Sequence, residues 1–207
     1  VAYRRPIDED NDGQQDPGSG EIWVVRTDGS APPTRLRSFI EGHLGDTFRI
    51  THDHEYVLYD FKEEGSSIRQ IYAVEVGGDN PVTQLTNPLS GESSYYRMLS
   101  GDAKTVLYTT NDETDGFGDV EVYATPTSGG PSVLVSDIAN DAIVLPRGVL
   151  DAQGAVVVEG NFDGGDLDLY VGALDGGDFH GVVENDFFSD TYVGASPGGT
   201  WIFYENC

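Results

Sequence analysis

Hydrophobic residues in this chain fall in short runs separated by Gly, Pro, Asp and Ser, and they do not recur at helical spacing. The runs are rich in Val, Ile, Leu and Tyr, as in Val57–Tyr59 and Val106–Tyr108, and turn-forming residues bound them. This pattern is typical of β-strands. No stretch shows a convincing apolar period of about 3.6 residues, so we expect helix to be essentially absent. The pattern therefore predicts an all-β protein built from many short strands.

The strand-like runs recur with a period close to 49 residues. Four runs end with an acid or amide, an aliphatic residue and an aromatic residue, and a Gly-containing turn follows each. The four aromatic residues are Trp23, Tyr72, Tyr123 and Tyr170. We interpret each repeat as four short strands, named A to D, and interpret the aromatic residues as core packing. We place the repeats at approximately 1–38, 46–87, 94–137 and 143–184, with a partial repeat at 190–207.

A repeat of this length with four antiparallel strands predicts a blade of a β-propeller. One such sheet cannot bury both of its faces alone, whereas stacking it against its neighbours does. The single region 1–207 carries about four blades' worth of strands and begins and ends within a B strand. Tyr192–Ala195 could supply the missing A strand of the first set and close a four-bladed ring, but Trp201–Tyr204 would then duplicate Val1–Tyr3. We therefore favour part of a larger propeller of about six to eight blades.

The order of turns and strands resembles the TolB-type, WD40-like (PD40) propeller repeat. The resemblance is carried by the Ser-Pro-Gly-Gly turn at Ser196–Gly199, the aliphatic–aliphatic–Tyr strand, the acidic hairpin, the acid–aliphatic–aromatic strand and the Gly-Gly turn. It covers nearly the whole chain, although Val158 stands where other repeats have Tyr. It implies a non-catalytic module that binds proteins or acts as a scaffold, located in the periplasm or secreted.

Two other functions fit the same repeat. The chain is also similar to the gating propeller of prolyl-oligopeptidase-type peptidases and to propeller lyases. No α/β region is present, so the catalytic part of such an enzyme would lie outside residues 1–207. In a third interpretation the chain is a subunit of a multi-protein surface assembly whose neighbours cover open strand edges.

The charge of the chain is strongly negative, with 36 Asp and Glu against 11 Lys and Arg and a net charge of −25. Such a surface repels nucleic acid and anionic membranes, so we expect neither as a partner. It suits cations, a basic protein partner or a high-salt environment. No apolar run is long enough to cross a membrane, and the single cysteine, Cys207, excludes an intrachain disulfide.

The acidic residues concentrate in the loops that join strand B to strand C, which predicts an acidic rim on one face. The longest of these loops, 6–20, contains alternate carboxylates followed by Gly, a pattern that favours Ca²⁺. The residues in ligand register are Asp8, Asp10, Asp12, Gln14 and Asp16. The usual closing Glu is replaced by Ser19, and Glu21 comes two residues late. A solvated acidic hairpin is the alternative.

A weaker version of this pattern follows the third B strand. Its candidate Ca²⁺ ligands are Asn111, Glu113, Asp115 and Asp119. The acids around Gly164 and Gly165 are better explained as hairpin residues. They are Asp163, Asp166 and Asp168.

Two motifs suggest catalysis or metal binding but fit the repeat better as turns. His52-Asp53-His54 could offer two imidazoles to a metal, yet it occupies the turn between strands A and B. Gly194–Gly198 matches the Gly-x-Ser-x-Gly nucleophile motif, which requires a following helix, whereas a strand follows here. We therefore expect no catalytic residue within the chain.

Overall fold

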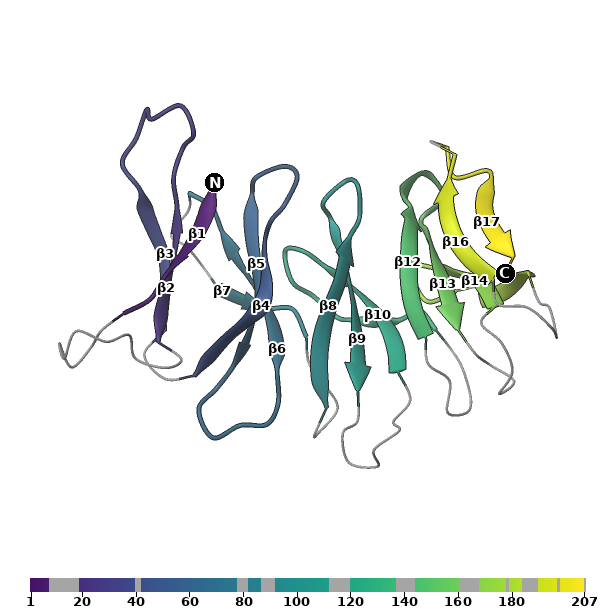
Figure 1. Cartoon of the computed structure of the whole chain (residues 1–207), viewed down its shortest axis with the longest axis horizontal. Coiled ribbons are helices and arrows are strands. Elements are labelled where there is room, and N and C mark those ends of the chain that lie inside the picture. The colour runs from purple at the N-terminus through teal and green to yellow at the C-terminus, as the bar shows by residue number, and fades with distance from the viewer. Residues whose placement is uncertain are drawn as a thin grey trace.

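The computed structural model describes residues 1–7, 19–39, 42–77, 82–86, 92–111, 120–136, 144–160, 168–177, 179–183, 190–196 and 198–206. These ranges contain strands and one short 3-10 turn at Asp151–Gln153, and no α-helix occurs within them. The predicted all-β class is confirmed. Figure 1 shows the sheets standing side by side in chain order.

Three complete sheets have four antiparallel strands each, in the order A-B-C-D. The first comprises β4 (His43–Ile50), β5 (Tyr56–Lys62), β6 (Gln70–Glu75) and β7 (Val82–Gln84). The second comprises β8 (Ser93–Leu99), β9 (Thr105–Asn111), β10 (Val120–Pro126) and β11 (Val133–Leu134). The third comprises β12 (Val144–Leu150), β13 (Ala155–Gly160), β14 (Asp168–Ala173) and β15 (Phe179–Val183). These sheets confirm the predicted four-stranded propeller blades.

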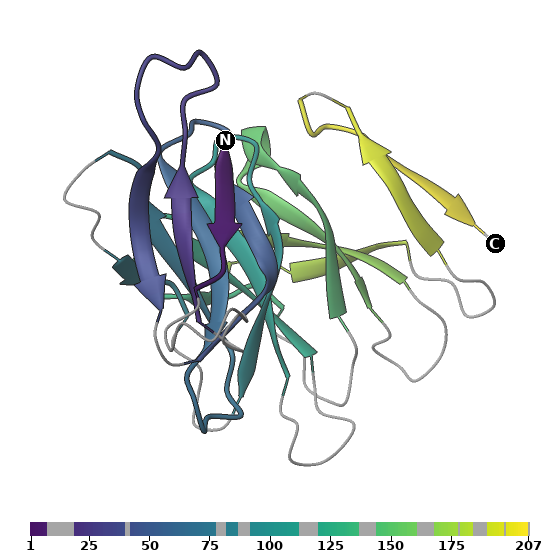
Figure 2. The ribbon, with the colours of Figure 1, turned by 60° about the vertical axis from the view of Figure 1, so that its left-hand side comes forward.

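Smaller sheets flank the three complete ones. Strands B to D of the first set are β1 (Ala2–Arg5), β2 (Gly20–Val24) and β3 (Thr34–Phe39). Strands A and B of the last set are β16 (Asp190–Ala195) and β17 (Ile202–Asn206), which pair with each other. Figures 1 and 2 show this pair far from β1. The four-bladed closure that would place β16 beside β1 is therefore not the arrangement of this structure.

An A strand forms one edge of every sheet except β1–β3, and β12 lies beside both β8 and β16. We call β4, β8, β12 and β16 the inner strands. Figure 1 shows the turns after β4 and β8 at the top of the view and the β5–β6 loop at the bottom. Glu63 and Glu64, in this described B–C loop, are exposed on the side opposite the A–B turns.

Apolar side chains fill the spaces between successive sheets. Along β5, Val57 and Tyr59 pack toward the preceding sheet, and Leu58 packs toward the following one. Successive side chains of a strand point to opposite faces, so a strand between two neighbours must be apolar at every position. This double burial explains why the B strands contain unbroken hydrophobic runs.

The aromatic residues of the C strands stack on a neighbouring ring within each complete blade. Tyr72 lies 5.5 Å from Tyr59 and Tyr123 lies 5.3 Å from Tyr108, measured between ring centroids. Tyr170 stacks on Phe179 at 5.4 Å. These contacts place the three tyrosines of the aromatic row in the packing of the sheets, as the repeat predicted.

The A–B turns after β4 and β8 share one hydrogen-bonding scheme. In the turn after β4, the Thr51 hydroxyl donates to Asp53 Oδ1 at 2.5 Å and accepts from the Tyr56 amide at 3.0 Å. Ser100 and Asp102 repeat this arrangement after β8, with a 2.7 Å hydroxyl-to-carboxylate bond. A carboxylate or hydroxyl that satisfies backbone amides in this way stabilises a tight turn.

Candidate functional site on the inner strands

Most of the predicted Ca²⁺ ligands lie outside the described residues. These are Asp8, Asp10, Asp12, Gln14, Asp16, Glu113, Asp115 and Asp119. Asn111 ends β9, and its side chain is likewise outside the description. Calcium binding therefore stays a prediction. Within the described ranges, no three His, Cys, Asp or Glu side chains are grouped so that they could hold a metal ion.

The two turn motifs have structural roles. Asp53 accepts hydrogen bonds from Thr51 and from the Glu55 amide, and the bond from Thr51 is the main reason that the pKa of Asp53 is lowered. The Ser196 hydroxyl accepts from the Trp201 amide at 3.1 Å, as Thr51 accepts from Tyr56. Two further histidines, His43 and His180, lie in strands β4 and β15.

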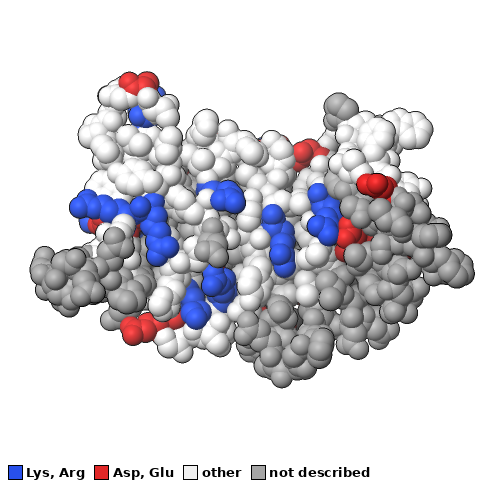
Figure 3. All heavy atoms as spheres, viewed as in Figure 1, with Lys and Arg blue, Asp and Glu red and all other residues white. Residues whose placement is uncertain are grey.

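A feature that the sequence did not predict is a row of arginines on the inner strands. In β8 and β12 a β-bulge occurs at the same point of the repeat, and the extra residues are Arg97 and Arg147. A bulge redirects a side chain and twists the strand locally. Arg49 on β4 is exposed, as are the two bulge residues. Figure 3 shows basic side chains gathered across the middle of this face, over the inner strands.

Each complete blade places a buried polar residue next to this row. The residue follows the B-strand position that pairs with the aromatic residue of strand C. The three residues are Asp60, Thr109 and Glu159, exposed by 2%, 0% and 3%. A buried polar group needs a hydrogen-bonding partner, and a buried charge needs a counter-charge.

In the blade β12–β15 the counter-charge comes from the bulge. Arg147 Nη2 lies 2.7 Å from Glu159 Oε1, and Arg147 Nε lies 3.1 Å from Glu159 Oε2. This is the two-point fork in which the planar guanidinium matches a carboxylate. Arg147 is consequently neutralised within its own blade.

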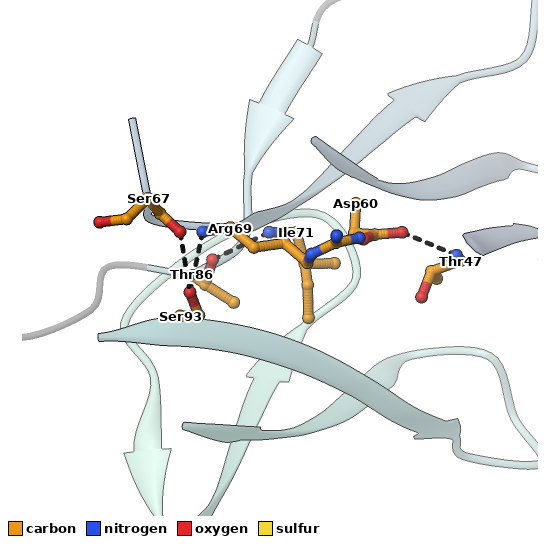
Figure 4. Close-up of polar contacts among 7 residues, drawn as sticks. All are labelled: Thr47, Asp60, Ser67, Arg69, Ile71, Thr86 and Ser93. Atoms are coloured by element: carbon orange, nitrogen blue, oxygen red, sulfur yellow. Dashed lines mark hydrogen bonds and ion pairs between the residues drawn. The ribbon is translucent and has the colours of Figure 1, made fainter. Parts of the chain in front are cut away.

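In the blade β4–β7 the counter-charge comes from the segment before β6. Arg69 forms an ion pair with Asp60, and Asp60 Oδ1 also accepts from the Thr47 amide at 2.7 Å (Figure 4). The pair lies against the backbone of Gly45, where a Cβ atom would collide with both charged groups. The Arg69 amide donates to the Ser93 hydroxyl of the next blade at 3.2 Å, so this network joins two blades.

The blade β8–β11 differs, because its buried residue is neutral. Arg97 Nε donates to Thr109 Oγ1 at 2.8 Å, and no described carboxylate lies within 4 Å of Arg97. Partial burial lowers the pKa of Arg97; Tyr95 raises it and the positive charge of Arg147 lowers it further. Arg49 likewise has no ion pair among the described residues and donates to the Phe48 carbonyl at 3.0 Å.

A cavity of about 730 Å³ lies between the first two sheets. Its walls include apolar residues of β2 and β4, such as Val24 and Ile50, together with Arg26 and His54. Such a mixed lining could accept a small apolar group, but no cluster of reactive side chains converges on it within the described residues.

Among the comparisons with known proteins, only the comparison with solved structures found matches. No family model matches the chain, and no curated protein matches it in sequence. Among solved structures, a prolyl endopeptidase aligns with a TM-score of 0.58 and 14% identity, over 92% of this chain and 27% of that one. A TolB protein from Agrobacterium tumefaciens aligns with a TM-score of 0.43 and 21% identity, over 91% of this chain and 61% of that one.

The sheet topology and the likeness to the prolyl endopeptidase define the chain as a β-propeller. The predicted propeller fold is therefore confirmed. At these identities the likeness shows the fold alone, and the chain spans about a quarter of the endopeptidase.

Proposed function

We propose that this chain is a non-catalytic propeller module that binds a protein partner through the face formed by its inner strands. The exposed row of Arg49, Arg97 and Arg147 on that face supports the proposal. Arginine is enriched in protein interfaces because its guanidinium combines charge, several donors and a flat stacking surface. Two of the three, Arg49 and Arg97, have no ion pair within the described residues.

The test is retention of a partner on the immobilised 207-residue chain from a native extract. The informative variant is Arg49→Gln with Arg97→Gln, because neither residue belongs to an internal ion pair. The matched control is Arg26→Gln with Lys104→Gln, which removes the same charge from exposed positions outside the inner strands, one after β2 and one in the β8–β9 turn. We expect the wild type and the control to retain the same protein and the Arg49/Arg97 variant to lose it. Equal retention by all three would contradict the proposal.

A second candidate function is the propeller part of a larger enzyme. The fold likeness to a prolyl endopeptidase favours it, since this chain aligns with only part of that protein. Any catalytic residues would then lie outside residues 1–207. Mass spectrometry of the natural product tests this, because a mass well above the 22.3 kDa of the chain is required for a catalytic part.

Calcium binding and an extracytoplasmic location complete the proposal. The described residues contain no helix that could cross a membrane. Ca²⁺ at the 8–16 loop should raise the melting temperature of the wild type, and Asp10→Asn with Asp12→Asn should abolish this effect. Mg²⁺ at the same concentration is the control. A melting temperature that does not respond to Ca²⁺ would remove calcium from the proposal.

A further inference from the structure

The three complete blades differ in the residue that faces an arginine from the equivalent buried position, which is a carboxylate in two blades and a hydroxyl in the third. At equivalent buried positions, Asp60 and Glu159 are carboxylates, and each neutralises an arginine. Thr109 occupies this position in the middle blade and gives Arg97 only a neutral hydroxyl acceptor. The repeat therefore leaves Arg97 without the internal carboxylate that pairs with Arg147 at the equivalent bulge.

The surroundings of Arg97 favour the binding of an anion. A guanidinium has five N–H donors, and Thr109 accepts from Nε, which leaves both Nη groups without a hydrogen bond to a described residue. Arg147 adds a second positive charge nearby, and its own carboxylate partner is already engaged. Partial burial weakens solvation of Arg97, which strengthens its attraction for an oxyanion.

Resting on the proposed protein-binding function, we propose that Arg97 anchors a carboxylate side chain from an acidic segment of the partner protein. The equivalent arginine, Arg147, already binds a carboxylate in this way, because its guanidinium donates two hydrogen bonds to Glu159. A carboxylate from the partner supplies to Arg97 the negative charge that Glu159 supplies to Arg147 and that neutral Thr109 does not supply. Partly exposed Tyr95, two residues before Arg97 on β8, adds aromatic surface close to its guanidinium.

A polyanion such as nucleic acid fits this surface poorly, because the chain carries a net charge of −25. Long-range repulsion acts on every phosphate of such a ligand, whereas the favourable contact is confined to the arginine row. A short acidic segment places one or two carboxylates in that row and is repelled less. Salt near about 0.15 M screens charges beyond roughly 8 Å and leaves the direct contact largely intact.

Fluorescence anisotropy with a labelled peptide of Glu-Gly repeats tests the proposal, with a Gln-Gly peptide as the neutral probe. The variants are Arg97→Gln, which removes the anchor, and Thr109→Glu, which supplies the missing internal carboxylate. Arg26→Gln is the control, and all three variants make the net charge more negative by one unit. We expect the Glu-Gly peptide to bind the wild type and the Arg26 variant, with affinity about tenfold lower in the other two.

Glu159→Thr provides the reciprocal test, because it releases Arg147 from its internal carboxylate. A variant whose circular dichroism matches the wild type should bind the Glu-Gly peptide more tightly. Arg97→Gln changes a surface-exposed residue and remains decisive if either buried substitution prevents folding. Unaltered peptide binding by folded Arg97→Gln would overturn the assignment, as would inorganic phosphate binding more tightly than the peptide.

The results separate this inference from the proposed function. If the Glu-Gly peptide fails to bind while the extract partner is still lost from the Arg49/Arg97 variant, the carboxylate anchor is wrong and the protein-binding face remains. If the peptide binds through Arg97 but no extract partner is retained, the anion site stands and the protein-binding role does not.

Discussion

The blades β8–β11 and β12–β15 have the same strand order and an arginine at the same bulge, but they differ at one buried position. Glu159 holds Arg147 in a two-point ion pair, whereas Thr109 gives Arg97 a single hydrogen bond. Both residues are almost completely buried. The blade therefore accepts either a carboxylate or a hydroxyl here, and the residue it contains decides whether the neighbouring arginine is neutralised internally.

In the blade β4–β7, the arginine that neutralises the buried carboxylate comes from a different segment of the chain. Arg69 precedes β6 rather than lying on the inner strand, yet it reaches the equivalent carboxylate, Asp60. The conserved element among the three blades is thus the buried polar site, and the source of the cation varies. Burial of a carboxylate is tolerable only with such a partner and with further hydrogen bonds.

The largest effect on stability should come from removing the buried carboxylate of the blade β4–β7, Asp60, which binds both an arginine and a backbone amide. Asp60→Ala leaves the Thr47 amide and Arg69 without their acceptor, and we expect a loss of about 3 kcal/mol in the free energy of unfolding. Urea denaturation measures it. Glu64→Ala, at an exposed loop position, should change stability by less than about 0.5 kcal/mol. A loss below about 1 kcal/mol for Asp60→Ala would mean that water replaces the carboxylate.

A smaller loss should follow from crowding the same ion pair. In Gly45→Ala, the added methyl would meet Arg69 and Asp60, and we expect about 2 kcal/mol of destabilisation. The matched control is Gly194→Ala on β16, where no atom lies within 4 Å of the added carbon. Asp60→Ala combined with Gly45→Ala should cost less than the sum of the two single changes, because the first makes room for the second. Additive losses would contradict this contact.

The middle blade should be less sensitive at its equivalent position. Thr109→Val keeps the shape of the side chain and removes the acceptor for Arg97, whose exposed side chain can turn to water. We expect a loss of about 1 kcal/mol or less in the free energy of unfolding. Chemical denaturation of this variant and of Asp60→Ala compares the two losses in the free energy of unfolding. Equal losses would show that the buried carboxylate and the buried hydroxyl contribute equally to stability.

The smallest effect concerns the A–B turns, in which the blades β4–β7 and β8–β11 agree. Hydrogen bonds from the Thr51 and Ser100 hydroxyls lower the pKa of Asp53 and of Asp102. A lowered folded-state pKa gives stability that is complete above the unfolded value, near about pH 4, and is lost as the pH falls through the folded value. Asp102→Asn should therefore flatten the fall in melting temperature below about pH 4. An unchanged slope would show that other carboxylates dominate.

Much of the fold could be predicted because the repeat reflects strand propensity and turn-forming residues, which act locally. The alternation of turns with runs such as Val57–Tyr59 and Val106–Tyr108 gave the strand order A-B-C-D, since strand propensity and turn chemistry act over a few residues. The turn roles of Thr51 and Ser196 follow from the same repeat. The arginine row was missed, although Arg49, Arg97 and Arg147 each precede an A–B turn by two or three residues. That spacing was the signal that could have revealed it.

The sequence by itself determined the all-β class, the blade length and the double-sided burial of the B strands, because these depend on residue order within one repeat. The tertiary structure alone decided which arginines are neutralised. Arg69 and Asp60 are nine residues apart, and Arg147 and Glu159 twelve, but a β-bulge and the closeness of neighbouring strands select the pairs. Coulomb and hydrogen-bond energies depend on distances of a few ångströms and on burial, which residue spacing does not fix.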